Sequence, residues 1–349
     1  MDNQQILQML PEALLPWFER SQRDLPWRAD KDPYHIWLSE IMLQQTRVEA
    51  VRGYYTRFLQ ALPTISDLSN ADEALLHKLW EGLGYYSRVR NLKKSAQVIM
   101  TQYGGVFPNR YEEILALPGI GEYTAGAICS IAFDQPTPAV DGNVLRVFAR
   151  LTDDATPIDK PAYKKQVQSA LRAVYPSQAG AFTQSLMELG ATLCGPNRKP
   201  QCENCPCRTF CRANINQTAQ NLPVRLPKRS RRTEELTVFI LNCDGKYALR
   251  KRTGNGLLAN LWEFPNVVSH LSLDQAIAYI ENMGIGVKDI VSITHKKHIF
   301  THIQWDMRGV YLNVSNEASA FAWLNAQEIQ KEAALPTAFR QFWEQIYDR

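Results

Sequence analysis

Hydrophobic residues recur at intervals of three and four along the first 215 residues. This spacing is clear at 37–43 and 71–80, and it is typical of helices that bury one face. No strand-like alternation appears in this half of the sequence. Short segments that carry Pro or Gly separate the predicted helices, at 62–64, 104–105, 117–119 and 175–177. We therefore predict an all-α domain over residues 1–215.

The hydrophobic pattern changes after residue 235. Short segments rich in β-forming residues alternate with turns such as Asp244-Gly245 and 254–256. The predicted strands are 237–241, 247–250, 261–264 and the alternating segment 303–308, and the predicted helices are 274–283 and 326–334. We therefore predict an α+β domain over residues 235–349.

Residues 216–234 lie between the two predicted domains and differ from both. They carry Pro223, Pro227 and basic side chains at 225, 228, 229, 231 and 232. A solvated connector and a strap that contacts phosphate both fit this composition, and we favour the connector.

Composition and charge exclude several classes of protein. The chain is 45% hydrophobic, which excludes a disordered protein, and no apolar run is long enough to span a bilayer. Its start, Met1 to Gln5, lacks the features of a signal peptide, so we expect a cytoplasmic protein. The net charge of +4 permits a polyanionic partner without requiring one.

Five of the seven cysteines fall within residues 194–211. Structural zinc sites usually pair two Cys-x2-Cys knuckles, whereas this segment has one. A [4Fe–4S] cluster suits the uneven spacing better. We predict that Cys194, Cys202, Cys205 and Cys211 hold one such cluster, with Cys207 as a bystander or a substitute ligand.

Two glycines, Gly119 and Gly121, precede an apolar helical segment. Such a turn exposes backbone N–H groups at a helix N-terminus, where they can bind phosphate. Alone it would indicate only a tight turn. Because a short helical segment (111–116) precedes it, we predict a helix–hairpin–helix that binds the nucleic-acid backbone. Asp141, considered alone, would be the N-cap of the next helix.

Taken together, these motifs resemble the endonuclease III superfamily of DNA glycosylases and, within it, the adenine DNA glycosylases. The resemblance extends over essentially the whole chain. It implies an all-α helix–hairpin–helix glycosylase domain with an iron–sulfur loop, followed by an α+β Nudix-like domain. The stretches that carry it are Leu25-Pro26-Trp27-Arg28, residues 38–46, Gly82-Leu83-Gly84-Tyr85-Tyr86, Asp141-Gly142-Asn143-Val144 and the four cysteines.

The resemblance also implies which side chains act on the base and the sugar. Adenine leaves only after a ring nitrogen is protonated, so the reaction needs a carboxylic acid of raised pKa. This role falls to Glu40, and Asp141 stabilises or traps the sugar cation with support from Asn143 and Tyr123. Tyr123 stands where bifunctional relatives place a Schiff-base lysine, so we expect no strong strand cleavage.

The adenine must leave the base stack before it reacts. By resemblance, Gln45 and Tyr85 insert into the duplex, and Thr46 and Leu83 lie near the opposing base. The expected base pocket consists of Trp27, Arg28 and Gln184. Considered alone, Trp27 and Leu83 would be interpreted as core residues.

The C-terminal half resembles the Nudix fold, which such glycosylases use to recognise 8-oxoguanine. The carboxylate helix of Nudix hydrolases is missing, since Glu263 is followed by Phe264-Pro265. We therefore expect binding without hydrolysis. The recognition loop of the family carries Phe-Ser-His, and this sequence has Phe300, Thr301 and His302.

The resemblance therefore implies a monomeric enzyme that excises adenine opposite 8-oxoguanine or guanine in double-stranded DNA. Three alternative functions each conflict with a feature of the sequence. A pyrimidine-damage glycosylase–lyase conflicts with Tyr123, and a Nudix hydrolase conflicts with the missing carboxylate helix. A non-catalytic iron–sulfur protein conflicts with the presence of both Glu40 and Asp141. The family usually has six residues between its first two cysteines, whereas this chain has seven.

Overall fold

The computed structural model describes residues 1–349 except 197–198, 228–229, 255 and 348–349. The described residues form two compact units, one of residues 1–70 with 91–227 and the other of residues 71–90 with 228–349. Residues 71–90, which the hydrophobic pattern assigns to the helical domain, thus group with the second unit.

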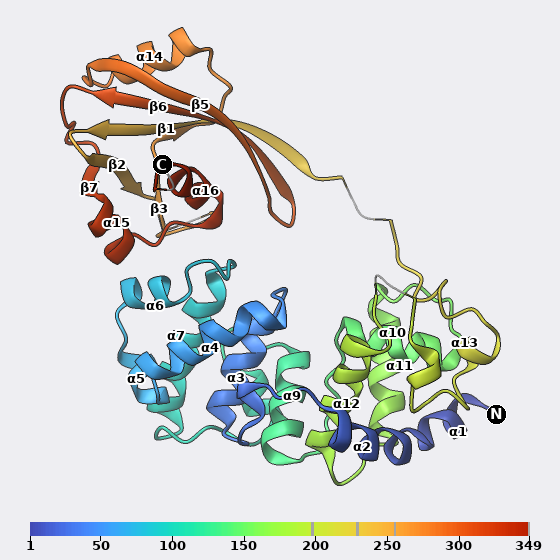
Figure 1. Ribbon diagram of the computed structural model, residues 1–349. Coiled ribbons are helices and arrows are strands. Elements are labelled where there is room, and N and C mark those ends of the chain that lie inside the picture. The colour runs from blue at the N-terminus through green and yellow to red at the C-terminus, as the bar shows by residue number, and fades with distance from the viewer. Residues whose placement is uncertain (197–198, 228–229, 255, 348–349) are drawn as a thin grey trace. The chain divides into compact units, whose positions relative to one another are not determined.

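The first unit is all-α, as predicted (Figure 1). Two 3₁₀ helices, Pro26–Arg28 and Cys202–Asn204, supplement its α-helices. The α-helices are α1 (Asn3–Gln8), α2 (Leu10–Ser21), α3 (Pro33–Leu43), α4 (Val48–Ala61), α5 (Ile65–Asn70), most of α7 (Ser87–Gln102), α8 (Tyr111–Leu115), α9 (Glu122–Phe133), α10 (Gly142–Thr152), α11 (Pro161–Arg172), α12 (Ala179–Thr192) and α13 (Arg212–Ile215).

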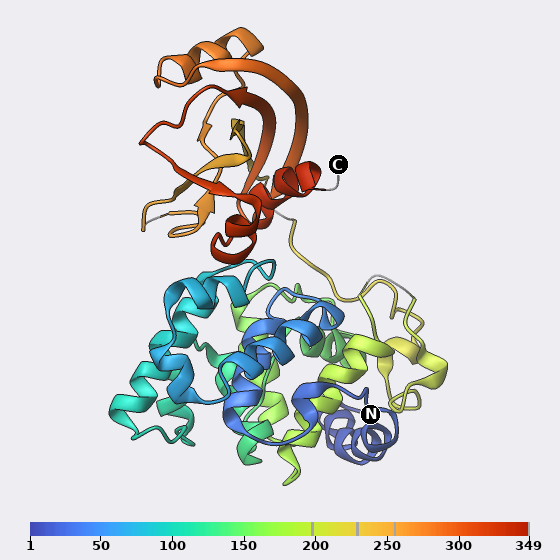
Figure 2. The same cartoon turned by 60° about the vertical axis from the view of Figure 1, so that its left-hand side comes forward.

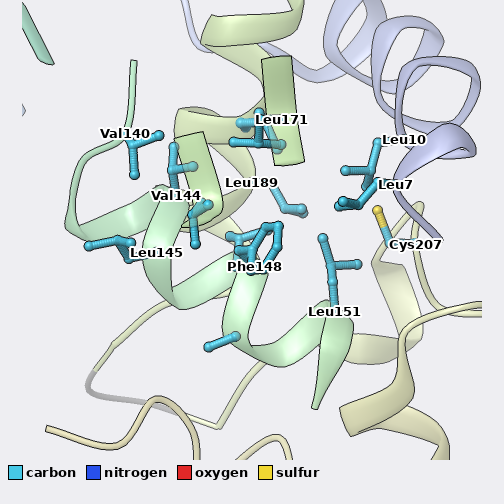
Figure 3. Close-up of a cluster of buried hydrophobic side chains, with 14 of the residues drawn as sticks. Leu7, Leu10, Val140, Val144, Leu145, Phe148, Leu151, Leu171, Leu189 and Cys207 are labelled. Atoms are coloured by element: carbon cyan, nitrogen blue, oxygen red, sulfur yellow. The ribbon is translucent and has the colours of Figure 1, made fainter. Parts of the chain in front are cut away.

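Helix α10 lies in the middle of the main core of this unit. Its residues from Val144 to Thr152 are all buried. Phe148 packs in one cluster with residues of α1, α2, α11 and α12, and Figure 3 shows this cluster around the helix. The packing fixes the start of α10, and therefore the position of Asp141 just before it.

The second unit contains a mixed sheet and four helices in the part of the chain that is described. The main order of the strands is β3-β2-β1-β6-β5, with β4 beside β1 and β7 beside β2. The strands are β1 (Arg232–Cys243), β2 (Lys246–Lys251), β3 (Trp262–Glu263), β4 (Asn266–Val267), β5 (Val287–Ile299), β6 (Ile303–Val314) and β7 (Ala322–Asn325), and the helices are α6 (Glu73–Leu79), α14 (Leu273–Glu281), α15 (Ala326–Glu332) and α16 (Thr337–Tyr347).

Both faces of this sheet are covered. Successive side chains of a strand point to opposite faces, so Leu236 and Val238 of β1 pack with residues of α15 and α16. Phe239 and Leu241 of β1 pack with residues of α14 on the other face. Figure 2 shows the long, curved β5–β6 pair, whose connecting turn lies at 300–302.

The structure differs from the predicted elements at several places. Strand β1 begins at Arg232, inside the predicted linker, because residues 232–235 pair in parallel with 303–306 of β6. Within the segment predicted as a connector, Ala219 and Leu222 are buried against α13. Lys228 and Arg229 of its basic run lie outside the described residues, as does Asn255 of the predicted 254–256 turn.

Strand β5 and helix α16 were not predicted. Strand β5 is exposed at most positions and shows little hydrophobic alternation, so only its pairing with β6 defines it. None of the described helices is long and apolar enough to cross a bilayer.

Candidate active site

A cavity of about 590 Å³ opens in the helical unit. This volume is within the usual range for the site of a small ligand. Residues from α3, α9, α10 and α12 contribute to its wall. Ten of the residues singled out in the sequence line it: Trp27, Arg28, Glu40, Gln45, Thr46, Gly121, Tyr123, Asp141, Asn143 and Gln184.

Glu40 is a buried carboxyl on an otherwise apolar helix. Helix α3 begins at Pro33 after the capping residue Asp32, and Glu40 in its third turn is 6% exposed. The hydroxyl of Tyr123 donates to Oε2 of Glu40 at 2.6 Å. Burial raises the pKa of Glu40 to about 7, and the charge of Asp141 acts in the same direction, while the Tyr123 hydrogen bond and Arg28 act against both. This carboxyl can therefore carry a proton near neutral pH.

Asp141 is both a helix cap and a cavity residue. Its Oδ1 accepts from the backbone N–H of Val144 at 2.8 Å, and its Oδ2 accepts from Nδ2 of Asn143 at 2.7 Å. Burial raises the pKa of Asp141, and these hydrogen bonds act against the rise. On sequence grounds a capping role and a functional role for Asp141 are alternatives, whereas in the structure one side chain both caps α10 and lines the cavity.

Asn143 is itself held from behind by Arg146 of the same helix. Nη2 of Arg146 donates to Oδ1 of Asn143 at 2.8 Å and to the carbonyl of Gly190 at 2.9 Å. Its Nε donates to the carbonyl of Cys194 at 2.8 Å. The amide of Asn143 is thereby oriented with its NH₂ group toward Asp141.

A further carboxylate in the wall, Glu188, has no role assigned from the sequence. It is 1% exposed and accepts hydrogen bonds from Arg23 Nε at 2.7 Å and from Arg28 Nη2 at 2.8 Å. Burial acts to raise the pKa of Glu188, but the two arginines outweigh it and lower the pKa, so the carboxylate stays ionised. Glu188 follows Gln184 by four residues on α12, and this i,i+4 spacing was the available signal.

The helix–hairpin–helix is formed by α8 and α9. Gly119 has φ +77°, and a Cβ there would lie 2.6 Å from the Asn91 side chain, so this turn requires glycine. Ser95 Oγ donates to the carbonyl of Pro118 at 2.8 Å and fixes the turn. Gly121 caps α9 and has open space where a side chain would stand, so a group could approach the backbone there.

The four predicted ligand cysteines line one small cavity in the same unit, together with Arg150. Nη1 of Arg150 donates to Sγ of Cys194 at 3.1 Å. Cys207 is fully buried beside Leu7 and Leu10 in the main core and is not among the residues that line this cavity (Figure 3).

The chemistry of the donor set is that of four thiols around one cavity. Over the described residues, no three His, Cys, Asp or Glu side chains are arranged to hold one metal ion. Four thiols around one cavity fit a centre in which each iron takes one cysteine ligand. Part of the long spacer between Cys194 and Cys202, residues 197–198, lies outside the described residues.

The remaining candidates lie in the second unit and are not among the residues that line the 590 Å³ cavity. Tyr85 is 46% exposed, whereas Leu83 is 7% exposed. The hydroxyls of Tyr85 and Thr301 are 3.0 Å apart. Phe300 packs edge-on against His298 and Trp305, and His302 ends the exposed 300–302 turn.

Glu263 of the second unit is occupied by structural contacts. It is 3% exposed and pairs with Arg250 Nε at 2.8 Å and with Arg252. Asn266 Nδ2 donates to the same carboxylate at 2.8 Å. Both oxygens of the Glu263 carboxylate therefore have structural hydrogen-bond partners.

Family models match both units. Residues 38–174 match the HhH-GPD superfamily base excision DNA repair proteins, and residues 236–345 match the NUDIX domain. The chain is 37% identical to an adenine DNA glycosylase of Arabidopsis thaliana, over 88% of this chain and 57% of that protein. It is 33% identical to the adenine DNA glycosylase of Rattus norvegicus, over 96% of this chain and 77% of that protein.

A solved structure adds to this similarity. The trapped covalent intermediate of endonuclease III with DNA aligns with a TM-score of 0.53 and 25% identity, over 62% of this chain and 99% of that chain. The predicted order of a helix–hairpin–helix glycosylase domain and a Nudix-like domain is thus confirmed, as is the prediction of a DNA glycosylase. Because the chain is 33% identical to the rat protein over 77% of that protein's length, it belongs to the family of adenine DNA glycosylases.

Proposed function

We propose that the protein excises adenine opposite 8-oxoguanine or guanine in double-stranded DNA and leaves an abasic site. The observation that carries this proposal is the pair of unlike carboxyls, Glu40 and Asp141, in one cavity. Glu40 accepts a hydrogen bond from a neutral hydroxyl, whereas Asp141 accepts N–H bonds from Val144 and Asn143. Such different environments favour a protonated acid at one position and a carboxylate at the other.

In this mechanism the adenine leaves the base stack and enters the cavity. Glu40 protonates N7, and the N-glycosidic bond then breaks with its electron pair on the base. Asp141 stabilises the resulting oxocarbenium ion or traps it until water attacks, with Asn143 and Tyr123 holding the two carboxyls. Trp27, Arg28 and Gln184 contact the base.

DNA binding is assigned to further residues of both units. The backbone at Gly119 and Gly121 contacts phosphate. Gln45 and Tyr85 insert into the duplex beside Thr46 and Leu83, and Phe300, Thr301 and His302 recognise the oxidised base.

Cys194, Cys202, Cys205 and Cys211 would hold a [4Fe–4S] cluster. When bound, it would cross-link the 194–211 loop. Arg150 contacts this loop through Cys194, and Arg146 contacts it through the carbonyl of the same residue. Both arginines lie on α10, which begins beside Asp141.

Single-turnover base release tests the proposal. Matched duplexes carry 8-oxoguanine:adenine, guanine:adenine or an oxidised thymine, and strand scission is followed before and after alkali. We expect adenine release that is fastest opposite 8-oxoguanine, with scission only after alkali. Cutting at oxidised thymine without alkali would instead indicate a glycosylase–lyase and overturn the interpretation of Tyr123.

A further inference from the structure

The loop of residues 82–85 has an unusual backbone. Gly82, Gly84 and Tyr85 have φ values of +99°, +71° and +47°. A bulky residue such as Tyr85 rarely adopts a positive φ, because its Cβ crowds the backbone. Contacts from outside the loop must therefore stabilise this conformation.

Arg88, in the first turn of α7, supplies many of these contacts. Its side chain is buried, and Nη2 donates to the carbonyls of Leu83 at 2.9 Å and Gly84 at 3.1 Å. Its backbone N–H donates to the carbonyl of Tyr85 at 2.9 Å. One residue thus contacts three consecutive backbone carbonyls of the loop.

The guanidinium of Arg88 also lies between two aromatic rings. Its Cζ is 5.3 Å from the ring centroid of Trp80 and 5.7 Å from that of Tyr85. Trp80 Nε1 donates to the carbonyl of Gly84 at 3.1 Å, so two side chains share that acceptor. Burial lowers the pKa of Arg88 to about 10, so the cation persists at neutral pH. A planar guanidinium can donate hydrogen bonds to two carbonyls and at the same time stack between two rings, whereas an ammonium group cannot do both.

We infer that Arg88 is a positioning residue that fixes the Leu83-Gly84-Tyr85 loop in the conformation that inserts into duplex DNA. This inference rests on the proposed function, which assigns Leu83 and Tyr85 to the DNA. A loop ordered before binding loses less conformational entropy when it enters the base stack. Within the same unit, the hydroxyl of Thr301 lies 3.0 Å from that of Tyr85, and this contact restrains the tip of the loop.

The test uses the full-length Arg88→Lys variant, which keeps the positive charge and loses the planar guanidinium with its paired N–H donors. Adenine release is measured on two 8-oxoguanine:adenine duplexes, one with paired flanks and one with mismatched flanks that already unstack the adenine. We expect the rate to fall about tenfold on the paired duplex and about twofold on the mismatched one, because only the paired duplex needs the inserted loop. A role in overall stability alone would lower both rates equally and would overturn the inference.

A second variant and a control keep the result unambiguous. Gly84→Ala places a Cβ at φ +71° with no atom within 4 Å, so it strains the loop without a clash, and it should show the same uneven loss. Arg57→Lys removes another guanidinium–aromatic contact, over Tyr54 at 4.7 Å, and should change neither rate. Equal losses on both duplexes for Gly84→Ala would contradict the inference as well.

Fluorescence of 2-aminopurine placed next to 8-oxoguanine gives a readout that needs no catalysis. Wild-type binding should raise the fluorescence as the loop separates the bases, and Arg88→Lys should lose most of this rise at saturating protein. A full rise in the variant would overturn the inference. Failure of the proposed function would be distinguishable, because the wild type would then release no adenine from either duplex whatever its fluorescence.

Discussion

The hydroxyl of Tyr123 donates a 2.6 Å hydrogen bond to Oε2 of Glu40, and both side chains line one cavity, with Glu40 buried and Tyr123 partly buried. Burial raises the pKa of Tyr123 well above its ordinary value, and the charge of Glu40 adds to the rise, so the tyrosine keeps its proton. It therefore remains a donor whether Glu40 is protonated or ionised. Burial alone would raise the pKa of Glu40 further. The hydrogen bond from Tyr123 acts against burial, and the pKa is about 7.

Base release should fall as the pH rises through about 7, because the reaction needs the protonated form of Glu40. Single-turnover rates from pH 5.5 to 9 give the profile, and Glu40→Gln should be nearly inactive throughout. A wild-type rate that is flat across this range would contradict the role of Glu40 as the acid.

The free energy of unfolding should also depend on the ionisation of Glu40. Because the folded-state pKa of Glu40 lies above its unfolded value, the carboxyl is most favourable to folding below pH 4.5, and this stability is lost as the pH rises through about 7. We therefore expect Glu40→Gln to be more stable than the wild type at pH 8.5 by up to about 3 kcal/mol, with a smaller difference at pH 5. Urea unfolding at the two pH values measures it.

Asp141→Asn should lower the rate of base release without disturbing the fold. Asparagine also caps helices, so the start of α10 and mispair binding should be retained. Base release should fall by about a hundredfold or more, because the negative charge facing the sugar is lost. Asp32→Asn is the matched control, since Asp32 caps α3 in the same way without lining the cavity. Full activity in Asp141→Asn would refute the two-carboxyl mechanism.

How far the sequence predicts this site depends on how local each interaction is. Glu40 and Asp141 could be singled out as candidates because short motifs surround them. For Glu188 the sequence offered only the i,i+4 spacing from Gln184, because its partner Arg23 is 165 residues away in the chain and only the packing of α12 beside α2 brings the two together. The dual role of Asp141 was also missed, because a capping residue and a cavity residue have the same sequence signal.

The same distinction holds for the fold. Helix α3 was predicted from its hydrophobic spacing, but its residues from Ile36 to Met42 are all buried, so it buries more than the one face that the spacing indicated. Strand β5 carries little such signal, because most of its side chains are exposed and its pairing with β6 is set by backbone hydrogen bonds. The start of β1 at Arg232 follows from pairing with residues 303–306, which lie about 70 residues further along the chain.

Glu188→Gln should destabilise the protein strongly. Glu188 is the buried counter-charge of Arg23 and Arg28, whose side chains are 34% and 13% exposed. Removing one partner of such a set leaves charge with no compensation, and we expect a loss of about 3 kcal/mol in the free energy of unfolding. Glu49→Gln, which removes an exposed ion pair with Arg52, is the control and should cost less than about 1 kcal/mol. Equal small effects in the two variants would show that the buried pairs contribute little.

The purified protein should contain iron at about four atoms per chain, with the visible absorbance of an iron–sulfur cluster. Cys205→Ser should lose most of this iron. Cys207→Ala should keep it, because Cys207 is fully buried and does not line the cavity that the other four cysteines share, although its thiol contacts that of Cys205. Stoichiometric zinc in the wild type would refute the cluster, and iron loss in Cys207→Ala would make that thiol a ligand.

Thr301 is an exposed residue of the 300–302 turn, and its hydroxyl lies 3.0 Å from the hydroxyl of Tyr85. Thr301→Val keeps the shape of the side chain and removes the hydroxyl, which should lower the preference for 8-oxoguanine:adenine over guanine:adenine by about fivefold, the value of one neutral hydrogen bond. Thr301→Ser keeps the hydroxyl and should keep the preference. The ratio of single-turnover rates on the two duplexes is the measurement. If valine and serine gave the same ratio, the hydroxyl would have no part in recognition, and Phe300 and His302 would have to account for it.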